Sequence, residues 1–199
     1  MAMIERDHRL AGRLRVTVTY LEMARPPCRL PAAPAVPGLS LKRIRHPGLT
    51  LYRQLYQQVG EPWLWSDRRR MDDDNLAEIL RHPAVELLAP TIGPELAGYA
   101  ELDRRSGDGR VNLAYFGLKP AWIGHGIGPW LLGRALALAW IGDTRLLTVN
   151  TCTFDHPKAL SLYCSLGFSP MRHVTRMITD PRLTGLLPLD AAPHIPLAE

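Results

Sequence analysis

The amino-acid sequence predicts an α+β fold in which a mostly antiparallel β-sheet is flanked by helices. Residues 85–118 contain three apolar segments joined through Gly-Pro and Ser-Gly-Asp-Gly, which are turn residues of antiparallel hairpins. The last segment continues through a glycine-rich turn into an apolar helix pattern, and a strand pattern follows at residues 145–151. With 199 residues, of which 46% are hydrophobic, the chain is long enough to bury one such core.

The N-terminal part of the chain is predicted to contribute one strand and a proline-rich arm. Residues 13–22 alternate polar and apolar side chains and are rich in β-branched types, a pattern typical of a half-buried strand. Residues 24–38 contain five prolines, which remove backbone donors and favour extended chain. We therefore expect three parts: a strand and arm (1–38), a central domain (39–180) and a proline-containing C-terminal tail (181–199).

The elements of the central domain follow from the spacing of its apolar residues. Strand patterns cover residues 39–44, 85–89, 95–103, 110–118, 145–151 and 172–178. Helix patterns cover residues 49–59, 74–81, 126–141 and 157–166. The aspartates before the second helix suit the positive end of its dipole. There is no internal repeat.

The net charge of +5 and the pI near 9.4 raise the question of nucleic-acid binding. The densest basic cluster, at residues 67–70, is followed by three aspartates at 72–74, and this local cancellation argues against a phosphate-tracking surface. No nucleic-acid partner is predicted. The excess positive charge suits the attraction of a polyanionic cofactor, or is an ordinary solvated surface.

The three cysteines are an odd number without Cys-x-x-Cys spacing, so neither a disulfide framework nor a zinc site is indicated, and no metal is expected. The N-terminus has no signal-peptide pattern, and no apolar segment is long enough for a membrane span. We expect a cytoplasmic protein without a membrane partner.

A glycine-dense turn at residues 124–128 is the first candidate site. Its glycines let backbone N–H groups converge on one point, and the helix that follows directs its unpaired donors and positive dipole end there, which suits a pyrophosphate. Pro129 stands where a Rossmann motif has its third glycine, and the Gly-Lys-Ser/Thr of a phosphate-binding loop is absent. Taken alone, the turn is either an anion site or a turn that binds nothing.

A second motif lies in residues 150–168, and the two together resemble the GCN5-related N-acetyltransferase (GNAT) superfamily. That family has V-x-P-x-x-R/Q-x-x-G-x-G/A at the turn, and N-x-x-A-x-x-x-Y followed by L-G-F downstream. The matching residues are Pro120, Gly126 and Gly128 in the first motif, and Ala159, Tyr163 and residues 166–168 in the second. The resemblance covers residues 39–180 and implies three layers around a mixed, mostly antiparallel sheet.

The resemblance implies acetyl-CoA as the cofactor. The residues it places there are Phe116, Gly117, Leu118, Gly124, His125, Gly126, Ile127, Gly128, Asn150 and His156. The chain departs from the family at Ile123, where Arg or Gln is usual, and at His156, where Asn is common. Because most of the cradle is backbone, Ile123 weakens the site more than it abolishes it. His156 precedes Pro157, so an N-cap role is its alternative.

Tyr163 is the candidate catalytic residue. When an amine attacks a thioester, the departing thiolate needs a proton or a hydrogen-bond donor, and in this family a tyrosine hydroxyl near the sulfur provides it. From the helical spacing alone, Tyr163 is better explained as a packed core residue, and the resemblance favours the catalytic role.

The general base and the acceptor site are less defined. Glu101, on the middle strand of the meander, is the predicted base, because alternation places it opposite Ala100 and Leu102; its alternative is a solvated surface position. Tyr115 is a weaker substitute for the base. Trp63 and Trp65 form a candidate wall for a cationic or aromatic amine, which Tyr115 joins, or they fill the core. Cys152 lacks the activated environment of a nucleophile.

The predicted function is direct transfer of an acetyl group from acetyl-CoA to a small-molecule or peptide amine in a ternary complex. The alternative is a non-catalytic acyl-CoA-binding or regulatory module of the same fold. A homodimer formed through the first strand and the arm is an open alternative to a monomer.

Overall fold

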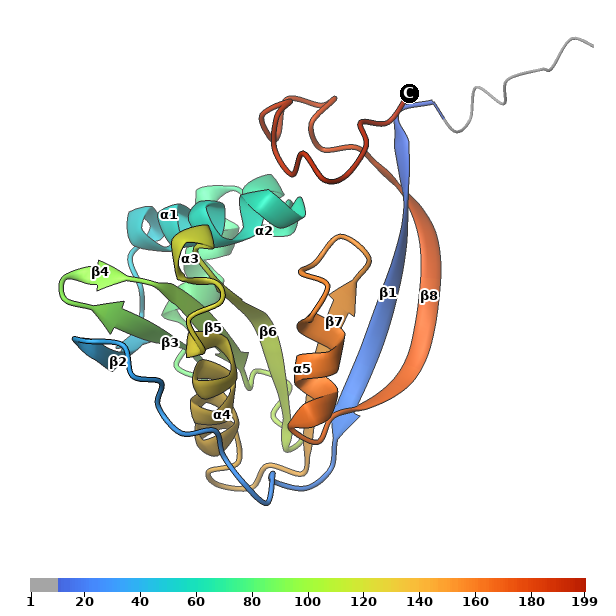
Figure 1. Cartoon of the computed structure of the whole chain (residues 1–199). Coiled ribbons are helices and arrows are strands. Elements are labelled where there is room, and N and C mark those ends of the chain that lie inside the picture. Colours follow the sequence, from blue (N-terminus) through green and yellow to red (C-terminus); the bar gives the residue numbers. More distant parts are fainter. Residues whose placement is uncertain (1–10) are drawn as a thin grey trace, which may run out of the picture.

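The computed structural model describes residues 11–199 and contains a mixed sheet of eight strands (Figure 1). The strand order is β2-β3-β5-β6-β7-β1-β8, with β4 paired to β3 beside this path. All pairs are antiparallel except β6 with β7. The strands are β1 (Arg13–Met23), β2 (Leu39–Arg45), β3 (Val85–Ile92), β4 (Glu95–Leu96), β5 (Gly98–Asp103), β6 (Arg110–Leu118), β7 (Leu146–Cys152) and β8 (Ser169–Thr179). The predicted fold class is confirmed.

The helices cover the sheet in two groups. They are α1 (Leu49–Gly60), α2 (Asp67–Arg70), α3 (Asp73–Arg81), α4 (Ile127–Ala139) and α5 (Ala159–Ser165), with 3₁₀-helices η1 (Glu61–Trp63) and η2 (Pro120–Trp122). Buried residues of α1 and α3 form one core cluster with β3 and β5, and those of α4 and α5 join a second cluster with β5, β6 and β7. Strand alternation assigns Tyr99 to the first cluster and Ala100 to the second. None of the helices among residues 11–199 is long and apolar enough to cross a membrane.

Two predicted elements differ in extent from the observed ones. The expected strand at residues 95–103 is divided into β4 and β5 at Ala97. Pro90, in β3, has no N–H to donate, and the β3–β5 ladder accordingly stops at the pair Leu88 and Ala100. The expected helix at residues 157–166 is shorter, because α5 begins only at Ala159.

Strand β1 lies inside the sheet, between β7 and β8 (Figure 1). It pairs with β7 through residues 18–23 and with β8 through residues 13–22, so residues 18–22 are paired on both sides. The proline-rich arm then crosses α4. A Cβ atom at Gly133 would lie 2.7 Å from the Pro31 ring, so this glycine permits the close approach of the arm.

The C-terminal segment, residues 180–199, packs against β1 instead of hanging free as a tail. Its apolar residues Leu187, Ala191 and Ile195 are buried in a third cluster with Leu14 and Val16 of β1. Arg182 holds the segment together, because it is paired with Asp180 at 2.8 Å and also donates to the carbonyl oxygens of Ala191, Ile195 and Pro196. Both members of the pair are buried.

A buried ion pair joins α2 to the sheet. The Arg68 guanidinium donates to Glu101 Oε1 on β5 at 2.7 Å, and the Tyr52 hydroxyl of α1 donates to the other carboxylate oxygen. Glu101 is 0% exposed and Arg68 is 6% exposed. Burial raises the pKa of Glu101, and the positive charge of Arg68 opposes that shift. The carboxylate therefore depends on Arg68 to stay ionised inside the protein.

Replacing Arg68 with Met is expected to lower the free energy of unfolding by about 3–5 kcal/mol, because it leaves a carboxylate buried without its cation. Urea denaturation followed by circular dichroism measures this change. Arg70→Met, in the same short helix but at an exposed position, is the matched control and should stay within about 0.5 kcal/mol of the wild type. Equal losses for the two variants would contradict the assignment.

Candidate active site

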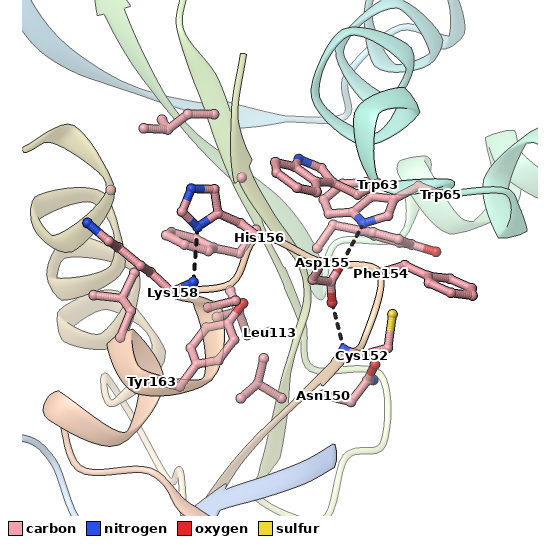
Figure 2. A pocket seen from close by; sticks show the side chains of 18 of the residues that line it. Trp63, Trp65, Leu113, Asn150, Cys152, Phe154, Asp155, His156, Lys158 and Tyr163 are labelled. Carbon is pink, nitrogen blue, oxygen red and sulfur yellow. Dashed lines mark hydrogen bonds between the residues drawn. The ribbon is translucent and has the colours of Figure 1, made fainter. Parts of the chain in front are cut away.

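A cavity of about 710 Å³ opens where β6 and β7 separate. Their parallel pairing is confined to Arg110–Asn112 and Leu146–Thr148. Beyond this point Ala114 forms a bulge in β6, since the β5–β6 register shifts between Leu113 and Tyr115. The residues of both strands that follow the pairing line the cavity, which Figure 2 shows from close by.

The glycine turn forms one end of the cavity. Gly124 and Gly126 have φ angles of +91° and +78°, in the region that favours glycine, and both line the cavity together with Gly128. Within residues 11–199, the backbone N–H groups of residues 124–126 make no backbone hydrogen bond outside the helices and strands, and those of Ile127 and Gly128 lie in the first turn of α4, where a helix offers them no acceptor. They precede or open α4, at the positive end of its dipole. The turn therefore has the unpaired donors and the space that a pyrophosphate requires.

The side chains of this turn contribute little to the cavity. Ile127 is fully buried in the core, and the His125 ring lies 5.8 Å from the Trp122 ring, outside the cavity lining. Ile127 and His125, which were predicted to bind the cofactor, can thus contribute only their backbone N–H groups. Ile123 does line the cavity, at the position where the family usually has Arg or Gln.

Tyr163 of α5 lies beside the end of β6. Its ring centroid is 6.0 Å from that of Phe116 and 5.8 Å from that of Phe168. Phe116, Gly117 and Leu118 line the cavity with it, as the resemblance implied. Burial raises the pKa of Tyr163, and the negative charge of Asp155 adds to the shift. The hydroxyl is therefore protonated at neutral pH, and no residue among 11–199 makes a side-chain hydrogen bond with it.

Asn150 and His156 line the cavity from β7 and from the β7–α5 loop. The expectation that His156 is the N-cap of α5 is wrong, because the helix begins later and its N-cap is Lys158. The His156 side chain still accepts a backbone bond near the helix start, from the Lys158 N–H to Nδ1 at 3.1 Å. This bond fixes the ring at the cavity wall (Figure 2).

An aromatic wall consisting of Tyr56, Trp63, Trp65 and Tyr115 lines the opposite side of the cavity. The rings of Tyr56 and Tyr115 lie 5.6 Å and 5.2 Å from that of Trp65. A Cβ atom at Gly60 would lie 2.4 Å from Trp65, so this glycine provides the seat for the indole. The predicted residues Trp65 and Tyr115 are therefore brought together, and they both pack against the core and face the cavity. Trp63 also lines the cavity, but its ring packs against those of His156 and His194, at 5.4 Å and 5.3 Å.

Asp155 is a cavity residue that sequence reasoning missed. Its carboxylate accepts two bonds that Figure 2 shows, from Trp65 Nε1 at 3.1 Å and from the Cys152 N–H at 2.8 Å, and a third from Thr151 Oγ1 at 2.9 Å. The bond to Trp65 joins residues that are far apart in the sequence. The only signal in the sequence was its place directly before His156, and no pattern distinguished it from other loop aspartates.

Glu101, the predicted general base, does not line the cavity. Alternation places it opposite Ala100 and Leu102 as expected, but that face is covered by α1 and α2, where Arg68 and Tyr52 occupy both carboxylate oxygens. The prediction overlooked α2, whose arginines were considered only as a surface cluster. Glu101 is a structural residue here, and it has no access to an amine in the cavity.

Cys152 lines the cavity but is not activated. Burial raises the pKa of its thiol to about 12, and the charge of Asp155 adds to the shift. The thiol is therefore protonated at neutral pH, as the sequence analysis expected of a residue without a nucleophilic role.

Beside the glycine-rich turn with its unpaired backbone donors, the mixed sheet opens into one cavity that also contains a tyrosine and an aromatic wall. The model of the acetyltransferase (GNAT) family matches residues 51–168, which is more than half of the chain. The chain belongs to this family.

Solved structures with the same fold include other GNAT proteins. One from Sphaerobacter thermophilus is 18% identical, with 84% of this chain and 51% of that chain covered and a TM-score of 0.58. A tandem GNAT protein from the clavulanic acid biosynthesis pathway is 18% identical, with 84% and 55% covered and a TM-score of 0.57. The chain spans about half the length of these two structures.

An aminoglycoside acetyltransferase from an uncultured soil metagenomic sample is 16% identical, with 65% of this chain and 87% of that chain covered and a TM-score of 0.53. At these identities the likeness establishes the fold. No curated protein sequence matches the chain.

Replacing Gly124 with Ala is expected to weaken acyl-CoA binding about tenfold or more, because the φ of +91° at this lining residue is strained for alanine and the donors of the turn would be displaced. Isothermal titration calorimetry measures the affinity. Gly142→Ala is the matched control, since Gly142 has a φ of +86° and, like Gly124, nothing within 4 Å of an added Cβ. Both variants should lose about 1 kcal/mol of stability. Equal affinities for CoA would show that the turn does not hold the cofactor.

Replacing Cys152 with Ser is expected to leave kcat within about twofold of the wild type, because a protonated thiol forms no acyl-enzyme. Thiol release from the acyl donor, followed in steady state, measures kcat. A loss of roughly a hundredfold, together with a thioester adduct on the wild-type protein in mass spectrometry, would instead establish covalent catalysis.

Proposed function

We propose that the protein transfers the acetyl group of acetyl-CoA directly to an amine in a ternary complex. One observation carries this proposal: two neighbouring residues at the end of β6 pack against different parts of the protein. Phe116 of β6 packs in the cluster that contains α4 and Tyr163, whereas Tyr115 packs with α1 and Trp65. The donor and the acceptor can therefore approach the end of β6 from opposite sides.

Acetyl-CoA supplies the thioester that is cleaved. The backbone donors of residues 124–128 would hold its pyrophosphate, and the end of β6 would lie along its pantetheine arm. Because Ile123 provides no hydrogen bond, this cradle depends on backbone donors and on the dipole of α4. This account fits acetyl and longer unbranched acyl groups alike. Family membership favours acetyl.

The transfer forms one C–N bond and breaks one C–S bond. The amine attacks the thioester carbonyl, its proton passes to water in the cavity, and the thiolate leaves. A thiol has an ordinary pKa near 8.5, well below that of the buried Tyr163 hydroxyl, so full proton transfer from this tyrosine is uphill. Tyr163 therefore acts chiefly by donating a hydrogen bond that stabilises the developing thiolate.

A non-catalytic acyl-CoA-binding module is the second candidate function. One observation favours it: the predicted base Glu101 is closed off by Arg68 and Tyr52. The two candidates differ in a simple measurement, because a binding module would be stabilised against thermal unfolding by acetyl-CoA but would release no thiol with any amine. Absence of acetyl-CoA binding would exclude both.

Replacing Tyr163 with Phe is expected to lower kcat about 10- to 100-fold while the affinity for acetyl-CoA changes little, because the hydroxyl acts on charge that appears only in the transition state. Thiol release gives kcat, and calorimetry gives the affinity. Tyr99→Phe is the matched control: its hydroxyl is also buried, has no partner and lies outside the cavity. A loss of affinity without a loss of kcat would assign Tyr163 to packing.

A further inference from the structure

The carboxylate of Asp155 has one acceptor position to spare. A carboxylate offers about four lone-pair positions, two on each oxygen. Oδ2 accepts from Thr151 Oγ1 and from the Cys152 N–H, whereas Oδ1 accepts only from Trp65 Nε1. One lone-pair position on Oδ1 is therefore open. The bond to Trp65 fixes the Asp155 side chain in the cavity (Figure 2).

The negative charge of Asp155 also lacks a counter-charge. Within residues 11–199, no lysine, arginine or histidine forms an ion pair with it, in contrast to Glu101 and Asp180. Three other charged residues border the cavity: Asp67 on α2, Lys158 at the start of α5 and Arg176 on β8. All three are exposed, whereas Asp155 is partly buried. Asp155 is thus the partly buried anion of the cavity, and a ligand cation would compensate it.

The walls around Asp155 are mostly apolar. Aliphatic and aromatic side chains from four separate parts of the chain line this part of the cavity: Val16, Val18, Leu64, Phe154 and Ile178 in addition to the aromatic wall. Ser66, Asp67 and Arg176 are polar members of the lining, so a ligand can keep a few polar contacts but makes most of its contacts with apolar side chains. The faces of Trp65 and its aromatic neighbours suit a flat apolar body with a cation beside it.

Trp65 also connects Asp155 to the strand at which transfer is proposed. A Cβ atom at Gly117 would lie 3.6 Å from Cη2 of the Trp65 ring, while Nε1 of the same ring donates to Asp155. One rigid indole therefore spans the distance between the end of β6 and the carboxylate. An amine bound at Asp155 lies along the same wall as the end of β6.

We propose that Asp155 binds the ammonium group of the acceptor, and that the acceptor is a singly charged primary amine on an apolar or aromatic body. This inference rests on the proposed acetyl transfer to an amine. The binding that it predicts can be measured without turnover. The bound ammonium ion gives up one proton to water before its nitrogen attacks the thioester carbon. Asp155 selects and positions the acceptor.

The test compares three ligands with one body and different head groups: 2-phenylethylamine, 2-phenylethanol and 3-phenylpropionate. Calorimetric titration into the CoA-saturated protein, and into the protein alone, gives each affinity. The amine is expected to bind about tenfold or more tightly than the alcohol, because a charge-assisted bond replaces a neutral one, and the carboxylate is expected to bind most weakly. Equal binding of the amine and the alcohol would overturn the proposal.

Asp155→Asn tests the residue itself. The amide keeps the shape but removes the charge, so the preference for the amine over the alcohol should fall to about twofold or less. Asp67→Asn removes an exposed carboxylate at the same cavity and should retain the wild-type preference. Retention of the preference by Asp155→Asn would contradict the assignment.

Two further measurements separate the possible failures. Trp65→Phe keeps an aromatic ring but removes the donor to Asp155, and it should weaken amine binding less than Asp155→Asn does. The melting temperature and the CoA affinity of each variant show whether the fold and the cradle persist.

If the amine binds with the predicted preference but no thiol is released, the proposed transfer fails and the ammonium site stands. If thiol is released with amines that bind equally well to Asp155→Asn, the ammonium site fails and the transfer stands.

Discussion

The short parallel pairing between β6 and β7 is the constraint on which the rest of the site depends. Hydrogen bonds hold these strands together only from Arg110 to Asn112 and from Leu146 to Thr148. If the pairing continued, backbone would fill the space that the cavity occupies. The bulge at Ala114 and the strand β1, which pairs with the far edge of β7, keep the two strands apart while leaving each one paired on its other side. The open wedge therefore costs few backbone hydrogen bonds, because the residues of both strands beyond the short pairing, apart from the bulge at Ala114, are paired with the outer neighbour.

The charged cluster at residues 67–74 is explained by structure. Arg68 is directed inward to Glu101, Arg69 is paired with Glu61 and donates to the carbonyl oxygen of Leu186, and Asp72 caps α3 by accepting from the Asn75 N–H. These contacts fix α2 between the sheet and the C-terminal segment. They also explain why Tyr115 keeps its place in the aromatic wall, since the Arg68 guanidinium lies 5.2 Å from the centre of its ring on the side of the core. The ion pair that buries Glu101 thus also helps to build the aromatic wall of the cavity.

The sequence was informative where local pattern decides structure. The meander, the glycine turn before α4 and the motif that contains Tyr163 were all predicted, because alternation, glycine spacing and helix periodicity are properties of adjacent residues. It was uninformative where contacts join distant segments. The position of β1 between β7 and β8 depends on a pairing of strands more than a hundred residues apart, and the packing of residues 180–199 depends on Arg182 reaching three carbonyl oxygens. The burial of Glu101 could not be predicted because α2 is a short charged helix without an apolar pattern.

The same distinction separates the two halves of the cavity. The donor half is formed by consecutive backbone groups in residues 124–128, so its chemistry is encoded in one short motif and is tolerant of side-chain changes such as Ile123. The acceptor half is formed by side chains from β1, η1, the β7–α5 loop and β8, which meet only in the folded protein. A change at any of these positions alters the acceptor wall without disturbing the cradle. Under the proposed function, the cradle constrains the acyl donor, whereas the identity of the amine depends on the contact between Trp65 and Asp155 and on the apolar residues that β1 and β8 add to the cavity.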